Sequence, residues 1–491
     1  RTVIFDISII NLQSDYNLTS DRQMLFNSFI FVLLLVITFG LYYIPKLRKS
    51  QVLILIISSL IFHAYDQLWF VLLLLFSAGI NIITSYYGVY GNAKKIKGIA
   101  LTGVVINLCA LAFFKYSTLV STTFFDPSDS IGKFLLHIPL PIGISFFTFE
   151  GISLLIDVWK EKYIKNTDIV PKSLAKHAQH TLFFISFFPH LIAGPILKAH
   201  DFFPQIKQKF FRDIQWEAAF KNLITGYFLK MVVADNLKDF THLMDQPYFF
   251  STITLFVLML GYSFQIFADF AGYSLIAIGL AKLFAYNFNT NFNFPYIATS
   301  FKEFWKRWHI SLSTFLMEYL YFPLGGNRKG KVRTYINLLL TMTLGGLWHG
   351  AAWTYALWGL LHGAALGIER FITDNTKIAH TRFTLILKGI CVFLFVSLAW
   401  LLFKLTPQGV SSFVYYAREN LTKELSILDI HLVMFVFIYS LPVIIYHVAY
   451  LCRDKKYWVS MKKVEYLFYA LMLLLIATNA GTSGSFIYFQ F

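Results

Sequence analysis

The sequence predicts an all-α protein that crosses a membrane many times and carries additional re-entrant or interfacial helices. Of its 491 residues, 57% are hydrophobic and only 14% are charged, whereas a soluble domain is about half apolar and about a quarter charged. So little polar surface cannot cover a water-soluble body of this size. The composition therefore excludes a soluble globular enzyme and indicates lipid as the solvent.

The charge pattern indicates membrane lipids, and no nucleic acid, among the partners. Lys and Arg number 42 against 26 Asp and Glu, for a net charge of +16, but these cations form short runs between apolar stretches. Such runs are typical of orientation signals and of contacts with anionic lipid. Cys109, Cys391 and Cys452 lie far apart without metal-type spacing, so we expect no disulfide framework and no metal site.

The chain changes character at Met24, where the apolar run MLFNSFIFVLLLVITFGLYYIP begins. We expect residues 1–23 to be a non-native or upstream segment outside the fold, and residues 24–491 to form a single transmembrane domain. No small-residue cleavage site follows this run, so the sequence predicts that it stays as an anchor.

Fourteen apolar segments follow one another along the chain, and a helix needs about 20 residues to cross the hydrocarbon. Several segments are too short or interrupted, so we expect roughly ten to twelve crossings plus re-entrant pieces. The Gly and Pro of PLPIG and AGPI predict breaks, because irregular backbone at membrane depth needs protein or water around it. The segments are 28–44, 51–64, 68–90, 98–114, 138–158, 181–197, 217–234, 250–280, 310–322, 335–349, 351–370, 384–404, 431–451 and 464–479.

Basic residues predict the orientation of the spans. They follow the first span within 46–49 and the third within 94–97. Cytoplasmic loops carry an excess of Lys and Arg. Odd-numbered spans are therefore expected to end in the cytoplasm, with the N-terminus outside.

Residues 301–331, FKEFWKRWHISLSTFLMEYLYFPLGGNRKGK, form the densest motif. Aromatic and apolar residues recur at intervals of three and four residues, which places them on one face of a helix. His309 lies on the polar stripe beside this face. This pattern predicts a basic, Trp-rich helix near a membrane surface. His309 is a candidate site residue, and the alternative is a polar-face histidine with local hydrogen bonds.

The end of this motif fits the spacing G-x-x-x-x-G-K of a phosphate-binding loop. Val332 stands where Ser or Thr must reach magnesium, and the preceding residues continue a membrane helix, so we reject that interpretation. Arg328 and Lys329 instead predict a basic cytoplasmic loop, with a weaker alternative as a binding site for the phosphates of a cytosolic donor.

His349 lies inside the apolar stretch LGGLWHGAAWTYALWGLLHG. Ionisable side chains at membrane depth are rare and are functional candidates by default. A neutral imidazole there can accept a proton from a hydroxyl or thiol nucleophile. The alternative is a histidine that donates to a carbonyl across a helix contact. His362, 13 residues further on in a similar setting, is expected to be structural.

Two further segments carry polar groups among apolar residues. Asp269 and Tyr273 lie four apart on one face of a predicted helix, and a buried carboxylate needs a partner, so we expect a buried polar network there. The segment 187–205, FFPHLIAGPILKAHDFFPQ, predicts a re-entrant loop closed by His190, His200 and Asp201.

Taken together, these motifs resemble the membrane-bound O-acyltransferase (MBOAT) family, in its bacterial branch of alginate and peptidoglycan O-acetylation proteins. The resemblance implies tilted helices around a central funnel or tunnel. His349 matches the family's near-invariant catalytic histidine, and His309 matches a second one that positions or polarises the substrate. The similarity runs from Met24 to the end of the chain, through PIGISFFTFEGISLLIDVW, FFPHLIAGPI, FADFAGYSLIAIGLAKLF, NFNFPYIATSFKEFWKRWHISLSTFLMEYLYFPLGGNRKG and GGLWHGAAWTYALWGLLHG.

The same resemblance implies an O-acyltransferase of the bacterial cytoplasmic (inner) membrane. Its donor would be cytosolic acetyl-CoA, with no bound cofactor, and its partner a periplasmic acetyltransferase of the Ser-Gly-Asn-His (SGNH) hydrolase type that acetylates a polysaccharide. Three apolar segments after residue 380 favour the acetylating branch. The alternatives are D-alanyl or other acyl transfer to teichoic acid or a glycolipid, and a flippase without chemistry, which the lack of a clear internal repeat disfavours.

The final residues 486–491, FIYFQF, form an aromatic tail. An apolar chain end is costly to leave in water, so the tail is expected to be buried in this protein or in a partner, as a docking peg. It also resembles the C-terminal motif Phe-x-Tyr-Phe of acyl-transfer systems, which implies that Tyr488 is an acyl carrier.

Overall fold

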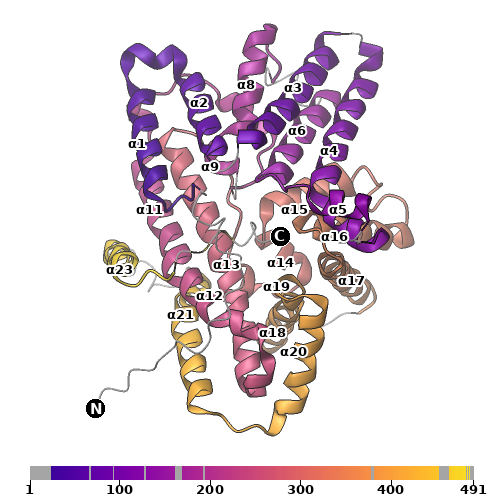
Figure 1. The fold of residues 1–491 in the computed structure, drawn as a ribbon, viewed down its shortest axis with the longest axis vertical. Coiled ribbons are helices and arrows are strands. Elements are labelled where there is room, and N and C mark those ends of the chain that lie inside the picture. The colour runs from indigo at the N-terminus through magenta and orange to yellow at the C-terminus, as the bar shows by residue number, and fades with distance from the viewer. Residues whose placement is uncertain are drawn as a thin grey trace.

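The computed structural model describes residues 24–65, 68–91, 93–126, 129–160, 169–191, 194–376, 381–452, 464–482, 484 and 486. Residues 1–23, which were predicted not to belong to the fold, lie beyond these ranges. Across the described ranges the regular structure is helical, with no strand (Figure 1). The expectation of an all-α polytopic protein is confirmed.

The helices follow the predicted apolar segments closely and include two π-helical stretches. In chain order the elements that matter below are α1 (Phe29–Tyr43), α2 (Gln51–Ala64), α3 (Leu68–Tyr90), α4 (Ile96–Phe124), α5 (Ser130–Leu136), α6 (Ile144–Trp159), α8 (Leu174–Ser186), α9 (Phe188–Leu191), α10 (Ala199–Phe202), α11 (Trp216–Tyr227), the π-helix η7 (Phe228–Ala234), α12 (Asp235–Thr241), α13 (Thr252–Leu283), α14 (Phe301–Arg307), α15 (Ile310–Leu316), the π-helix η11 (Met317–Tyr321), α16 (Lys331–His349), α17 (Trp353–Asn375), α18 (Arg382–Ala399), α19 (Leu401–Lys404), α20 (Pro407–Glu419), α21 (Ile427–Leu451) and α23 (Glu465–Thr478).

Six helical segments of the described chain are long and apolar enough to cross a membrane by themselves. Two further apolar helices, α1 and α23, are shorter. The predicted total of crossings, which counts shorter and interrupted segments, stays a prediction. The six are Pro45–Ala64, Leu68–Tyr90, Ile96–Phe124, Thr252–Leu283, Arg382–Lys404 and Ile427–Leu451.

The outer helices present apolar side chains to their surroundings. Trp69 on α3 is 76% exposed and Leu101 on α4 is 57% exposed, and Leu, Ile, Val and Phe dominate the exposed positions of α21. Contiguous apolar surface on this scale is too large for a soluble monomer. These faces therefore contact lipid.

Side-chain caps explain where several helices begin. Ser28, Ser251 and Ser300 each accept a hydrogen bond from a backbone N–H in the first turn of α1, α13 and α14. Such a bond satisfies one of the donors that a helix start leaves without an intrahelical partner. The short polar residues between apolar runs are therefore the start signals of the helices.

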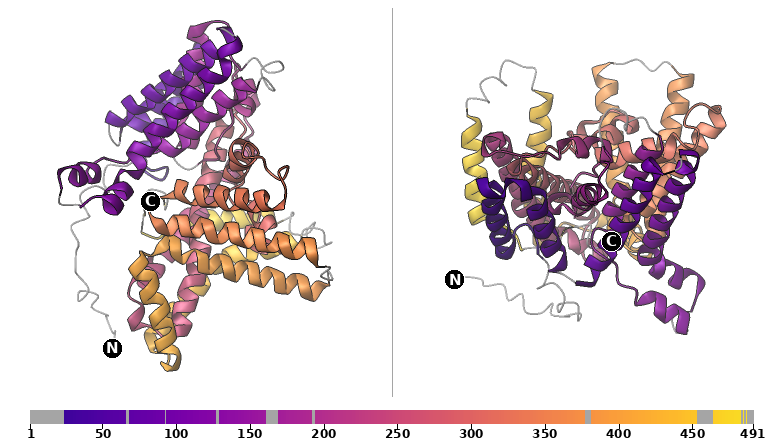
Figure 2. Two further views of the ribbon diagram at one scale, coloured as in Figure 1. Left: turned by 90° about the vertical axis from the view of Figure 1, so that its right-hand side faces the viewer. Right: turned by 90° about the horizontal axis from the view of Figure 1, so that it is seen from above.

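Helix α13 forms the centre of the fold, and most of its side chains are buried. It packs against α11, η7, α12 and α21 and runs through the middle of the molecule in Figure 1. Figure 2 shows the early helices α3 and α4 at a clearly different tilt from α16, α17 and α18. The observed arrangement of tilted helices agrees with the expected fold.

Both predicted breaks are found. Gly143 of PLPIG has a φ of +78°, immediately before α6 begins, and a Cβ at this position would lie 2.9 Å from the Leu191 carbonyl oxygen. Only glycine combines this backbone conformation with so close an approach. Residues 194–198, which include the Gly and Pro of AGPI, are also not helical.

Candidate active site

The densest motif does not form the single continuous helix that its periodicity predicts. Helix α14 ends at Arg307, His309 adopts a left-handed conformation with a φ of 43° and a ψ of 55°, and α15 starts at Ile310. A non-glycine residue with positive φ costs conformational energy and persists only where its surroundings hold it. The predicted stripe is therefore correct in its buried positions, Phe304 and Leu312 among them, but wrong as one helix.

Asn291 holds His309 in this conformation. The Asn291 side-chain oxygen accepts hydrogen bonds from the Ser311 backbone N–H at 3.2 Å and from the Ser311 hydroxyl at 2.9 Å. It also lies 3.1 Å from His309 Nδ1, and the Asn291 carbonyl accepts from the Ile310 N–H at 2.9 Å.

These contacts identify the tautomer of His309. A backbone N–H can only donate, so the Asn291 atom that faces Ser311 and His309 is its oxygen. His309 Nδ1 must then carry the hydrogen, which leaves the lone pair of a neutral ring on Nε2. Sequence reasoning missed Asn291, because nothing in the run NTNFNF distinguishes it from the other two asparagines.

His349 is the last residue of α16 and is 4% exposed. Its ring centroid lies 5.1 Å from that of Trp348, 5.4 Å from that of Trp358 and 5.2 Å from that of Phe403. His309 is fully buried, and its ring centroid lies 6.0 Å from that of His349. The fold thus brings the two predicted histidines together in an enclosure of aromatic rings.

Glycines let the two helices around His349 approach closely. A Cβ on Gly346 of α16 would lie 2.2 Å from the Tyr355 carbonyl oxygen, and a Cβ on Gly359 of α17 would lie 2.2 Å from the Met342 carbonyl oxygen. Backbone therefore packs on backbone, and any larger side chain would push the helices apart. This contact explains the glycines that flank the histidine in its motif.

A pair of neutral imidazoles in apolar surroundings can accept and donate protons without water as an intermediary. Aromatic walls lower the local dielectric, so a proton accepted by one ring is not shared with bulk solvent. One imidazole can accept a proton from a nucleophile while the other, through its Nε2 acceptor, orients the nucleophile. The geometry is suited to acyl transfer.

His362 lies apart from this pair. It is fully buried, with its ring centroid 4.7 Å from that of Trp358 and 5.2 Å from that of Trp305. Trp358 lies between it and His349 in the chain of ring contacts. The structure therefore places His362 in the aromatic packing behind the site.

Asp269 has a buried cation as its partner. Lys230 Nζ, on the π-helix η7, donates to Asp269 Oδ1 at 2.8 Å and to Asp235 Oδ1 at 2.7 Å, and all three side chains are at most 5% exposed. The same ammonium lies 5.4 Å from the centroid of the Tyr273 ring. Sequence reasoning named Asp269 and Tyr273 but missed Lys230, which lies 39 residues before Asp269.

The chain after α23 returns to this region. The Gly481 N–H donates to the Met231 carbonyl at 2.9 Å, and the Thr482 hydroxyl donates to Asp239. Phe486 is fully buried, with its ring centroid 4.4 Å from that of Tyr273 and 5.8 Å from that of Phe270. Phe270 in turn lies edge-on to His309, with centroids 4.6 Å apart. The tail thus enters the aromatic shell of the histidine pair at Phe486, and Tyr488 lies outside the described residues.

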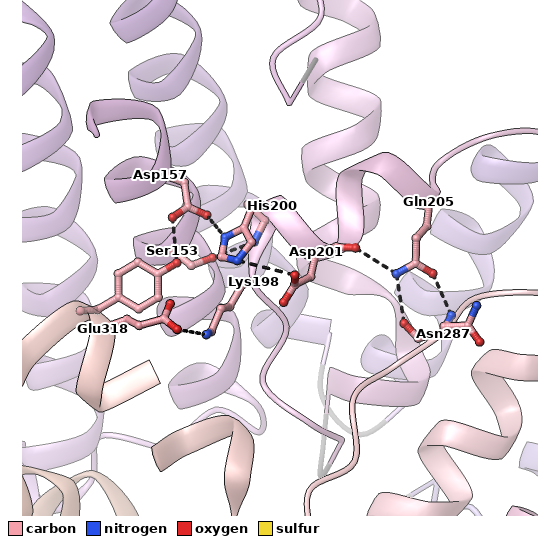
Figure 3. Close-up of polar contacts among 10 residues, drawn as sticks. Ser153, Asp157, Lys198, His200, Asp201, Gln205, Asn287 and Glu318 are labelled. Carbon is pink, nitrogen blue, oxygen red and sulfur yellow. Dashed lines mark hydrogen bonds and ion pairs between the residues drawn. The ribbon is translucent and has the colours of Figure 1, made fainter. Parts of the chain in front are cut away.

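The segment 187–205, predicted to be re-entrant, is tied to α6 by two carboxylate–imidazole pairs. Glu150 Oε1 lies 2.9 Å from His190 Nδ1, and Asp157 Oδ2 lies 2.8 Å from His200 Nδ1. Figure 3 shows the contact of Asp157 with His200. Asp157 Oδ1 also accepts a hydrogen bond from the Tyr319 hydroxyl at 2.8 Å. These polar residues close the loop.

Arg328 and Lys329 lie far from the histidines. Both are exposed, in a turn that Asn337 holds through its hydrogen bond to the Gly326 carbonyl at 3.0 Å. Helix α16 separates this loop from His349 and has 19 residues, or about 28 Å at about 1.5 Å per residue. A donor bound at the loop would have to reach along this helix to the pair. Among the described residues no cluster of His, Cys, Asp and Glu could hold a metal ion.

Comparison with known proteins agrees with this fold. The family model described as MBOAT, membrane-bound O-acyltransferase family, matches residues 177–408, a stretch that contains both histidines. The chain belongs to the membrane-bound O-acyltransferase family and is an acyltransferase of a membrane.

Its relatives include two kinds of acetylating protein. The protein named "Probable alginate O-acetylase AlgI" of Pseudomonas aeruginosa is 38% identical over 406 residues, which cover 80% of this chain and 74% of that protein. The peptidoglycan O-acetyltransferase of Helicobacter pylori is 37% identical over 410 residues, covering 78% and 77%. The teichoic acid D-alanyltransferase of Bacillus subtilis is 28% identical over 283 residues, covering 54% and 69%.

Proposed function

We propose that this protein takes an acetyl group from cytosolic acetyl-CoA and passes it across the bacterial inner membrane for O-acetylation of a cell-envelope or exported polysaccharide, of alginate or peptidoglycan type. The observation that carries the proposal is the buried pair His309 and His349. The acetylating relatives, which match about four-fifths of the chain, support the acyl group and the class of acceptor.

In this proposal His349 is the general base and His309 positions the substrate through the Nε2 acceptor, because its one N–H is held by Asn291 and cannot polarise the thioester carbonyl. A hydroxyl oxygen attacks the acetyl carbonyl carbon while its proton moves to the His349 imidazole. The C–S bond then breaks, and the thiol leaves with that proton. Hydrogen-bond donors aimed at the developing oxyanion lower the barrier further.

The partners follow from the same proposal. A periplasmic SGNH-type acetyltransferase would receive the acetyl group and select the polymer, and the basic loops would face the cytosol with the N-terminus outside. Transfer of D-alanyl to teichoic acid is the second candidate. The relative with that activity matches only about half of this chain, at 28% identity.

Reconstituted vesicles test the proposal directly. Purified protein in vesicles, given acetyl-CoA on one side, is expected to release coenzyme A when the acceptor system is present on the other. The proposal would be contradicted if the protein transferred D-alanyl from a carrier protein but released no coenzyme A from acetyl-CoA.

The proposed role of His309 predicts that His309→Ala lowers acetyl transfer by roughly 10²-fold, nearly as much as loss of a general base. His447→Ala is the matched control, because His447 is also buried but contacts the Val443 carbonyl on α21. Initial rates of coenzyme A release per folded protein measure the difference. Equal losses in both variants would indicate a structural role for His309.

The proposed donor site predicts that Arg328→Ala combined with Lys329→Ala weakens the use of acetyl-CoA mainly through KM, because cations hold a charged ligand by its phosphates. Alanine substitution of Lys207 and Arg212, two exposed cations in the segment between α10 and α11, is the control. If donor is consumed only when added on the side that faces the N-terminus, the assignment of the basic loop is wrong.

A further inference from the structure

Lys115 is a buried lysine on α4 that the proposed chemistry does not use. It is 7% exposed, and within the described ranges no carboxylate forms an ion pair with it. A buried ammonium needs compensation from other groups. Its contacts therefore show what it does.

All of its contacts lead to the end of α16 or to the start of α6. Lys115 Nζ donates to the carbonyl oxygens of Trp348 and His349, the latter at 3.1 Å, and to the Ser145 hydroxyl at 3.1 Å. An ammonium has three hydrogens. These three acceptors use all of them.

The next residue on α4 extends the same contact. The Tyr116 hydroxyl donates to the Leu347 carbonyl at 2.9 Å. Side chains of α4 thus bind three successive carbonyls, at residues 347, 348 and 349. The last four carbonyls of a helix have no intrahelical partner and carry partial negative charge.

The usual backbone cap is not found at this helix end. Gly350 follows with a φ of −158° and a ψ of 156°, which is extended backbone and not the left-handed conformation of a Schellman or αL cap. The cation and the phenol of α4 take the place of such a cap. His349 is itself the last helical residue, so the direction of its Cα–Cβ bond depends on how this end is held.

We propose that Lys115 is a positioning residue that orients His349 toward His309 by binding the carbonyls at the end of α16. The inference rests on the proposed role of His349 as the base. Sub-ångström placement matters for such a group, and a misplacement of about 1 Å can cost about 10²-fold in rate.

The test compares Lys115→Met with wild type in acetyl-CoA-dependent vesicles. Loss of all three donors is expected to lower kcat by about tenfold to a hundredfold, with KM for acetyl-CoA changed less than about twofold because the donor site is untouched. Lys115→Gln offers two donors for three acceptors, so its kcat is expected to lie between those of wild type and Lys115→Met. Tm and the amount of folded protein are measured alongside.

Two controls separate positioning from folding. Lys209→Met removes another buried lysine, whose ammonium lies 4.6 Å from the Tyr286 ring centroid, away from the histidine pair, and is expected to keep kcat. Lys115→Met in a His349→Ala background is expected to add no further loss, because Lys115 acts through His349.

A wild-type kcat in both Lys115→Met and Lys115→Gln would overturn the inference. The inference would also be overturned if Lys115→Met lowered kcat further in the His349→Ala background. The same holds if the lower rate of Lys115→Met were explained entirely by a smaller amount of folded protein. The proposed function fails separately if His349→Ala alone keeps full activity.

Discussion

His349→Ala is expected to abolish acetylation of the surface glycan while the protein still inserts and folds. If the imidazole is the general base, the loss is roughly 10²-fold or more. The side chain contacts the rings of Trp348, Trp358 and Phe403, and one imidazole contributes little to the stability of a fold with so many buried aromatic residues. Base-released acetate from glycan of cells with equal amounts of the protein measures the effect.

His362→Ala is the matched control for this variant. His362 is buried in the same aromatic shell and shares Trp358 as a neighbour, so its removal leaves a similar cavity without removing the base. It is expected to keep most of the activity per folded protein. Normal acetate release from His349→Ala would refute the assignment, and equal losses at His349, His309 and His362 would favour a structural role for all three.

Tyr488→Phe is expected to stop glycan acetylation while partner binding is retained. The proposal is that the phenol carries the acetyl group from the coenzyme to the partner, so that coenzyme A never crosses the membrane. A phenol has an ordinary pKa of about 10 and is a better leaving group than a sugar alkoxide. Phe486, two residues earlier, lies against Phe270, the ring that contacts His309, which supports a tail that reaches the histidine pair.

The substitution keeps the ring and removes only the nucleophile, so it separates a carrier from a docking peg. Tyr466→Phe, at an exposed tyrosine of α23, is the control and is expected to acetylate normally. Mass spectrometry of the wild-type C-terminal peptide should show an added acetyl group. If Tyr488→Phe acetylated the glycan fully with partner binding unchanged, Tyr488 would not be an acyl carrier. The tail would then act only as a docking peg.

The sequence by itself determined the class of the protein, the breaks at PLPIG and AGPI, and the side chains worth testing. These are local properties, because hydropathy over about 20 residues decides whether a segment can enter lipid, and Gly and Pro act on their own backbone. A histidine or aspartate among apolar residues is conspicuous for the same reason. His349 and Asp269 could therefore be named in advance, whereas His309, on the polar stripe of its motif, was named through the resemblance to the family.

Only the tertiary structure decided how these side chains are held. The break at His309 overrides a helical pattern that is unbroken in sequence, because Asn291 and Ser311 stabilise a left-handed residue there. Lys115 lies 234 residues from His349, and Lys230 lies 39 residues from Asp269. A buried charge is tolerated only where distant segments supply its partners, and which segments meet depends on the packing of the helices and not on any local pattern.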